Sequence, residues 1–74
     1  MRTYTIVAEP EPEGGYFVTV PALPGCFTRG RTIEEFRARA VEAIETHIAG
    51  LRLDGEPVPE ETGEAQLLAV TGAA

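Results

Sequence analysis

Cys26 and His47 are the residues best suited to act as a catalytic nucleophile and its base. They are the one cysteine and the one histidine of this 74-residue chain. A catalytic thiol needs a neighbouring base, and usually a third group that orients the base. Cys26 opens a short predicted strand, whereas His47 falls in the fourth turn of a predicted helix, at the edge of its apolar side. We therefore expect Cys26 to pack as a small apolar side chain and His47 to be half-buried. The chain is predicted not to be an enzyme.

The other ionisable residues give little support to metal or phosphate chemistry. One cysteine and one histidine are too few for a structural zinc site. The carboxylates fall in predicted loops or on the outer side of the helix, where they cannot converge as two-metal hydrolysis requires. The residues around Gly30 lack the lysine and the spacing of a phosphate-binding loop. No metal or cofactor is expected.

The charge of the chain bears on its partners. Twelve acidic residues face six arginines, there is no lysine, and the net charge is −6. Such a charge repels nucleic-acid phosphate and anionic lipid and attracts basic proteins. The alternative explanation is that the charge only keeps a small protein soluble. The nearest approach to a basic patch, Arg29 and Arg31, stands close to Glu34 and Glu35 in the sequence. We expect no direct nucleic-acid binding by this chain alone.

Length and hydropathy predict one domain over residues 1–74. No apolar run approaches the ~20 residues that cross a bilayer, and the N-terminus lacks the apolar core of a signal peptide. A lone cysteine fits a reducing compartment, so we expect a cytoplasmic protein without membrane contact. A domain of this size buries only about 60% of the surface that its unfolded chain exposes, and oligomerisation would reinforce its thin core.

Alternating residues predict an antiparallel hairpin at the start of the chain. Residues 3–9 and 16–20 alternate between two faces, and the proline, glycine and glutamate residues between them predict a loop over residues 9–15. One face gathers the apolar residues Tyr4, Ile6, Ala8, Tyr16, Val18 and Val20. The second face carries Val7 and Phe17 among threonines.

The stretch VPALPGCFTRG follows the hairpin. The backbone preferences of its prolines and glycines explain its composition without a catalytic role. Pro21 cannot donate a ladder hydrogen bond, so the second strand ends there. Pro24 and Gly25 suit the central positions of a type II turn. Residues 26–29 are a short third strand, which completes an antiparallel meander of three strands.

One long helix is predicted next. Thr32 and Glu35 form a capping box, in which each side chain accepts from the other's backbone N–H. The helix ends near Leu53, and Gly55 allows the chain to leave it. An apolar stripe follows at steps of three and four residues: Ile33, Phe36, Ala40, Ile44, Ile48 and Leu51. This stripe covers one face of the sheet, and the second face is left for water or a partner.

A last strand is predicted over residues 65–70, after a proline-rich acidic loop. A right-handed crossover through the helix would lay it parallel to the first strand. The fold class is therefore α+β with the order β-β-β-α-β. Leu68 and Val70 lie on one side of this strand, and we expect them to contribute to a homo-oligomer interface, because an unpaired apolar edge recruits another chain.

An ordered set of motifs resembles the N-terminal domain of HicB-type antitoxins. The set runs over roughly residues 3–60 and comprises Gly15-Tyr16, Pro21, Leu23-Pro24-Gly25-Cys26, Gly30, Thr32 and Glu35, followed by Glu42-Ala43-Ile44, Asp54-Gly55, Pro57 and Pro59. The resemblance implies a partly degraded ribonuclease-H-like fold without that fold's catalytic carboxylates. It also implies binding and silencing of HicA, a small basic toxin that cleaves messenger RNA.

Many members of this family carry a C-terminal DNA-binding domain. Too few residues follow the matching region here, so we expect no such domain in this chain. The leading hypothesis is a non-catalytic antitoxin that neutralises a HicA-like toxin. The alternative is an orphan oligomeric regulator or scaffold without a toxin. Candidate partner-binding residues are the outer helix carboxylates Glu34, Glu42 and Glu45, with Val7 and Phe17 on the second sheet face.

Overall fold

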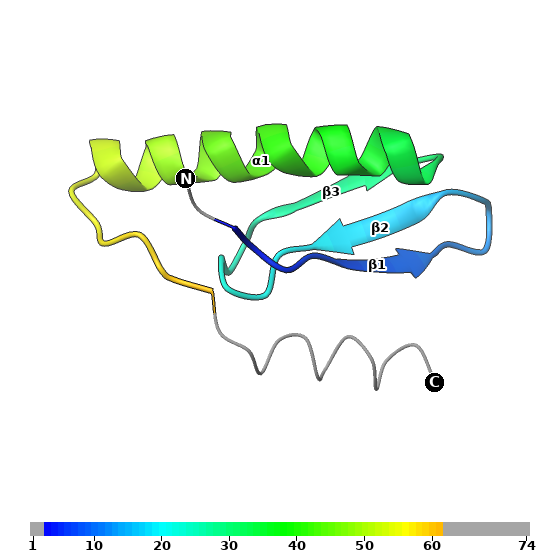
Figure 1. The fold of residues 1–74 in the computed structure, drawn as a ribbon, viewed down its shortest axis with the longest axis horizontal. Helices are drawn as coiled ribbons and strands as arrows, with labels where there is room; N and C mark the ends of the chain where they lie inside the picture. Colours follow the sequence, from blue (N-terminus) through cyan, green and yellow to red (C-terminus); the bar gives the residue numbers. More distant parts are fainter. Residues whose placement is uncertain (1–2, 62–74) are drawn as a thin grey trace.

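The computed structural model describes residues 3–61, in which three antiparallel strands precede one long helix (Figure 1). The strands β1 (Val7–Pro10), β2 (Tyr16–Thr19) and β3 (Phe27–Gly30) lie in the order β1-β2-β3, and α1 spans Ile33–Leu53. The predicted α+β class and meander are confirmed. The predicted last strand, residues 65–70, lies outside the described residues, and so do Leu68 and Val70.

The first strand starts later than the sequence predicted, at Val7 instead of residue 3. Val7 pairs with Thr19, the last residue of β2. Any earlier residue would need a partner beyond Thr19, where Pro21 has no N–H to offer. The segment before β1 bonds elsewhere: the Tyr4 hydroxyl donates to the carbonyl of Pro59 (2.5 Å), and the Thr5 N–H donates to Glu61 Oε1 (2.6 Å).

The proline-rich stretch folds into the predicted turn. The Cys26 N–H donates to the carbonyl of Leu23 at 2.9 Å, and Gly25 has a φ of +86°. That φ belongs to the third residue of a type II turn, where glycine avoids the clash that a Cβ would cause. The Val20 N–H then donates to the carbonyl of Cys26 at 3.1 Å, which brings the chain back alongside β2 at the start of β3.

The start of α1 departs in one detail from the predicted capping box. Thr32 is the N-cap, and its hydroxyl accepts from the Glu35 N–H at 3.1 Å. The Glu35 carboxylate accepts from the N–H of Arg31 at 2.9 Å, one residue before the cap. The same carboxylate lies 3.8 Å from Arg39, one turn along. The helix ends at Leu53, as predicted, and the chain leaves through Gly55.

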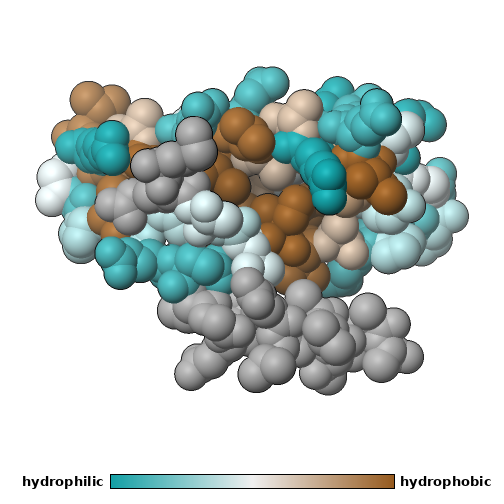
Figure 2. Space-filling view, in the orientation of Figure 1, coloured by the Kyte–Doolittle hydropathy of each residue, from teal (hydrophilic) through white to brown (hydrophobic). Residues whose placement is uncertain are grey.

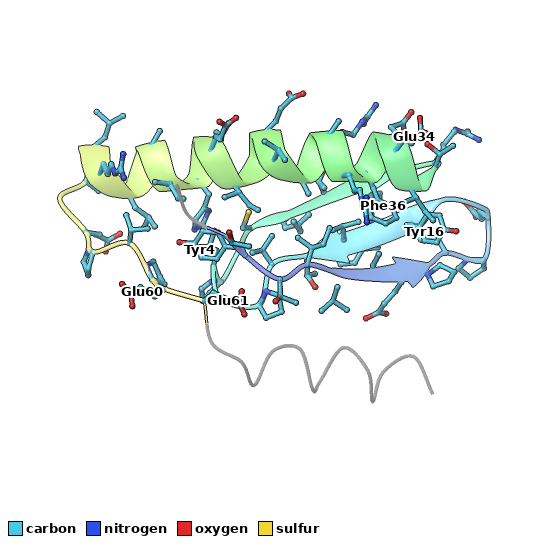
Figure 3. The ribbon with its side chains drawn as sticks, in the orientation of Figure 1. Tyr4, Tyr16, Glu34, Phe36, Glu60 and Glu61 are labelled. Carbon is cyan, nitrogen blue, oxygen red and sulfur yellow. The ribbon has the colours of Figure 1, made fainter. Side chains whose placement is uncertain are left out.

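The core lies between α1 and the predicted apolar face of the sheet. Val18, Phe36 and Ala40 form one buried cluster, flanked by Ile6, Ala8 and Tyr16. Val20, Leu23 and Cys26 form a second, flanked by Tyr4, Ile6, Ala43, Ile44 and Ile48. Figure 3 shows Phe36 reaching from α1 toward Tyr16, and the two rings meet edge to face at 5.2 Å.

The first residue of the predicted stripe, Ile33, does not reach this core. Ile33 is 54% exposed, whereas Phe36 and Ala40 are buried. The helix comes into close contact with the sheet where Phe36 meets the backbone of Gly30, the last residue of β3. Ile33 is the first residue of α1 and comes before that contact, so its side chain remains in solvent. The prediction that Ile33 covers the sheet is wrong.

Candidate functional site

The face of the sheet away from α1 carries a row of large side chains. Residues opposite one another in an antiparallel pair point to the same face. The register places Val7 opposite Thr19 and Thr19 opposite Phe27. It also places Phe17 opposite Arg29. We refer to this surface as the aromatic face and define it by Val7, Phe17, Thr19, Phe27 and Arg29.

Three side chains of the aromatic face form one contacting group. The rings of Phe17 and Phe27 have their centroids 5.7 Å apart and are tilted by 38°. The guanidinium of Arg29 lies 5.1 Å from the centroid of the Phe17 ring, within cation–π distance. Phe27 is nevertheless 57% exposed. The face is therefore an ordered apolar surface that water still reaches.

Carboxylates of the β1–β2 hairpin border this face. Arg29 Nε donates to Glu11 Oε1 at 3.1 Å, which holds the guanidinium over the aromatic ring. Glu9 stands opposite Phe17 in the register, and Glu13 is exposed in the hairpin loop. Glu11 thus pairs with the guanidinium, and Glu9 and Glu13 add negative charge to the same hairpin, which makes this border acidic. The ion-pair partner of Arg29 is Glu11, whereas Glu35 pairs with Arg39.

The structure brings Cys26 and His47 to one shallow groove, which the sequence analysis did not anticipate. The groove runs between β3 and α1 and is lined also by Thr28, Glu42 and Thr46. Cys26 is only 6% exposed and packs in the second core cluster, and this burial raises the pKa of its thiol. Because the thiolate is the reactive form, such an environment disfavours attack by this sulfur. The predicted packing role of Cys26 is confirmed.

The five candidate partner-binding residues do not form one surface. Val7 and Phe17 belong to the aromatic face, whereas the three glutamates lie on α1, across the sheet. Glu42 lines the groove on the β3 side, and Glu45 lines a groove on the opposite flank of the helix. Glu34 stands at the exposed start of α1 (Figure 3).

Sequence reasoning missed Phe27 and Arg29, the two members that β3 contributes to the aromatic face. Their alternation with Cys26 and Thr28 was the available signal. Once Cys26 is assigned to the core, its neighbour Phe27 must point to the other side of the strand. Pairing β3 with β2 then sets Phe27 and Arg29 beside Phe17.

The described residues bring no three histidine, cysteine or acidic side chains together as metal ligands. Over the same part of the chain, no helix combines the length and the apolar character that crossing a membrane requires. An exposed group of aromatic and arginine side chains is instead typical of surfaces that bind proteins. The fold and this face thus define a small α+β domain with the features of a protein-binding module.

The family of the chain agrees with that class. Residues 4–71 match the HicB-like antitoxin of bacterial toxin–antitoxin systems, and the chain belongs to this family.

Several known proteins are similar to this chain. A UPF0150 protein of Thermoplasma acidophilum is 41% identical over 61 residues, which make up 82% of this chain and 88% of that protein. A UPF0150 protein of Synechocystis sp. is 43% identical over 58 residues, or 78% of this chain and 73% of that protein. Antitoxin HicB 1 of Photorhabdus laumondii is 39% identical over 56 residues, which cover 76% of this chain but 36% of that antitoxin.

Proposed function

We propose that this chain is an antitoxin that neutralises a small basic toxin ribonuclease of the HicA type, in the cytoplasm, by binding it at the aromatic face. The chain contributes no catalysis of its own. Its membership of the HicB-like antitoxin family supports the toxin–antitoxin role. The observation that carries the choice of surface is the contact between the half-buried Phe17 and the exposed Phe27, with Arg29 held over the ring of Phe17.

The composition of the aromatic face suits a protein partner. Phenylalanine and arginine are enriched in protein–protein interfaces, and the binding energy concentrates in a few such side chains. Covering Phe27 removes apolar surface from water at about 25 cal/mol per Å². Arg29 is already oriented by Glu11, so less side-chain freedom is lost when a partner docks.

Charge favours a basic partner at this place. The chain has a net charge of −6, the hairpin residues Glu9 and Glu11 border the aromatic face, and Glu13 is exposed in the loop between β1 and β2. Opposite charge accelerates encounter and excludes wrong partners more than it raises affinity. A basic toxin would be steered to the acidic border and then held by the aromatic side chains beside it.

The outer helix carboxylates are the weaker place for this contact. Glu34, Glu42 and Glu45 are exposed and lie on the layer opposite the aromatic face. Exposed ion pairs contribute about 0–1 kcal/mol each and are screened by salt. They add to the attraction of a basic protein without offering it an apolar surface to bury.

Co-expression in growing bacterial cells tests this function. The toxin to be tested is a short basic protein encoded by a reading frame next to that of this chain, and its expression is to be induced with or without this chain. We expect this chain to relieve the growth arrest. Phe27→Ser should weaken the rescue, and Leu53→Ser, at a residue that is 89% exposed at the end of α1, should not. A folded wild-type chain that leaves growth arrested would contradict the proposal and favour the orphan regulator.

A further inference from the structure

A second apolar surface lies on the flank of α1 that faces the start of the chain. A groove runs there between the helix and residues 3–6, with Tyr4, Ile6, Ile44 and Ile48 in its walls. The space-filling view shows apolar side chains along the border between the helix and the sheet (Figure 2). Val41 also lines the groove and is 56% exposed, an apolar exposure that neither the core nor the aromatic face explains.

Val41 is the centre of a row of residues four apart along α1. The row is Ile33, Arg37, Val41, Glu45 and Ala49, and its last four members line the groove. Residues four apart on a helix are neighbours along one side of it and form a ridge, through which two helices contact one another. Two of the exposed large apolar side chains of this chain, Ile33 and Val41, belong to this single ridge.

We infer that this ridge pairs with the same ridge of a second copy, in an antiparallel helix–helix dimer whose two-fold axis passes through Val41. In a two-fold interface, residue i of one chain meets residue j of the other, and j meets i. Two residues meet when they stand equally far from Val41 on opposite sides. Val41 then meets Val41, Ile33 meets Ala49, and Arg37 meets Glu45 in two symmetric ion pairs.

The charges of Arg37 and Glu45 favour this register over its neighbours. They also favour a second copy of this chain as the partner that packs on the ridge. An axis one turn earlier would oppose two Arg37 side chains, and an axis one turn later would oppose two Glu45 side chains. Like charges that face one another across an interface are costly, so the ridge is self-complementary about Val41 and not about its charged neighbours. The dimer uses α1 alone and leaves the aromatic face, on the other side of the sheet, free for a toxin. It therefore does not depend on the proposed function.

Sedimentation equilibrium of the full-length chain, over the micromolar range, tests this inference by charge reversal. We expect the wild-type chain to dimerise. Arg37→Glu and Glu45→Arg should each raise the dimer dissociation constant by about tenfold or more, because each single change opposes like charges twice. The double variant Arg37→Glu/Glu45→Arg restores opposite charges and should dimerise nearly as well as the wild type.

Glu42→Arg is the matched control, because it makes the same charge change on the other flank of α1, in the groove with Cys26. It should leave the dissociation constant within about twofold of the wild type. Circular dichroism of each variant separates loss of pairing from loss of folding. A monomeric wild-type chain would overturn the inference, since the groove would then have another occupant. So would a dimer that both single reversals leave intact, or a double variant that stays as weak as the single ones.

Discussion

The backbone of Gly30 lies directly against Phe36: a Cβ atom placed on Gly30 would stand 2.7 Å from the Cα, Cβ and N atoms of Phe36. This contact joins the end of β3 to the first turns of α1, and the edge-to-face contact between Tyr16 and Phe36 supports it from β2. The helix is thereby held on one face of the sheet, and the aromatic face remains on the other.

Gly30→Ala should destabilise the fold. The added methyl group meets helix backbone, which cannot move without moving α1, so we expect a loss of about 1–3 kcal/mol in the free energy of unfolding. Urea denaturation measures it. Gly50→Ala is the matched control, because a Cβ there has no neighbour within 4 Å and Gly50 lies inside α1. Alanine should stabilise the helix at that position by about 0.5–1 kcal/mol. Equal effects of the two substitutions would contradict the close contact.

The turn before β3 gives a second prediction. Gly25 has a φ of +86° with open space around it, so Gly25→Ala meets no steric clash with neighbours but forces alanine into the left-handed region. We expect a loss of about 1–2 kcal/mol in thermal or urea unfolding. Gly25→Asn should cost less, because asparagine tolerates this region. An alanine variant as stable as the wild type would show that the turn is not type II.

Burial of Cys26 predicts a dependence of stability on alkaline pH. Burial raises the pKa of the folded thiol above its ordinary value of 9.0, so the unfolded chain loses this proton first. The stability due to the neutral thiol is complete below the unfolded pKa and is lost as pH rises through the folded pKa. The advantage of the wild type over Cys26→Ala in urea unfolding should therefore shrink above pH 9.0.

Alkylation checks the same thiol independently. Iodoacetamide should modify Cys26 more slowly in the folded chain than in urea, and the difference should persist at neutral pH. A folded thiol that reacts faster than the unfolded one would indicate a depressed pKa and an activated nucleophile. That result would contradict the packing role of Cys26.

The features that local chemistry decides were predictable from the sequence. Pro24 and Gly25 specify their turn through their own backbone preferences, and Thr32 and Gly55 mark the ends of α1 in the same way. The apolar alternation of β1 and β2 identified the core face, because burial of one face imposes a period of two.

Features that depend on a distant partner were not predictable in the same way. Residues 3–6 alternate like a strand, yet they bond to the segment after α1, since β2 ends before it could pair with them. Ile33 fits the apolar stripe but comes before the point where helix and sheet touch. The aromatic face required the pairing register of β3, which places Phe27 and Arg29 beside Phe17.

The measurement that tests the central claim most directly is isothermal titration calorimetry of this chain with a purified short basic protein encoded by a neighbouring reading frame. We predict tight binding, with a dissociation constant that Phe27→Ser raises by about tenfold or more and that Leu53→Ser leaves unchanged. No binding by the folded wild-type chain would contradict the claim. Equal affinity of the two serine variants would show that the toxin binds elsewhere than the aromatic face.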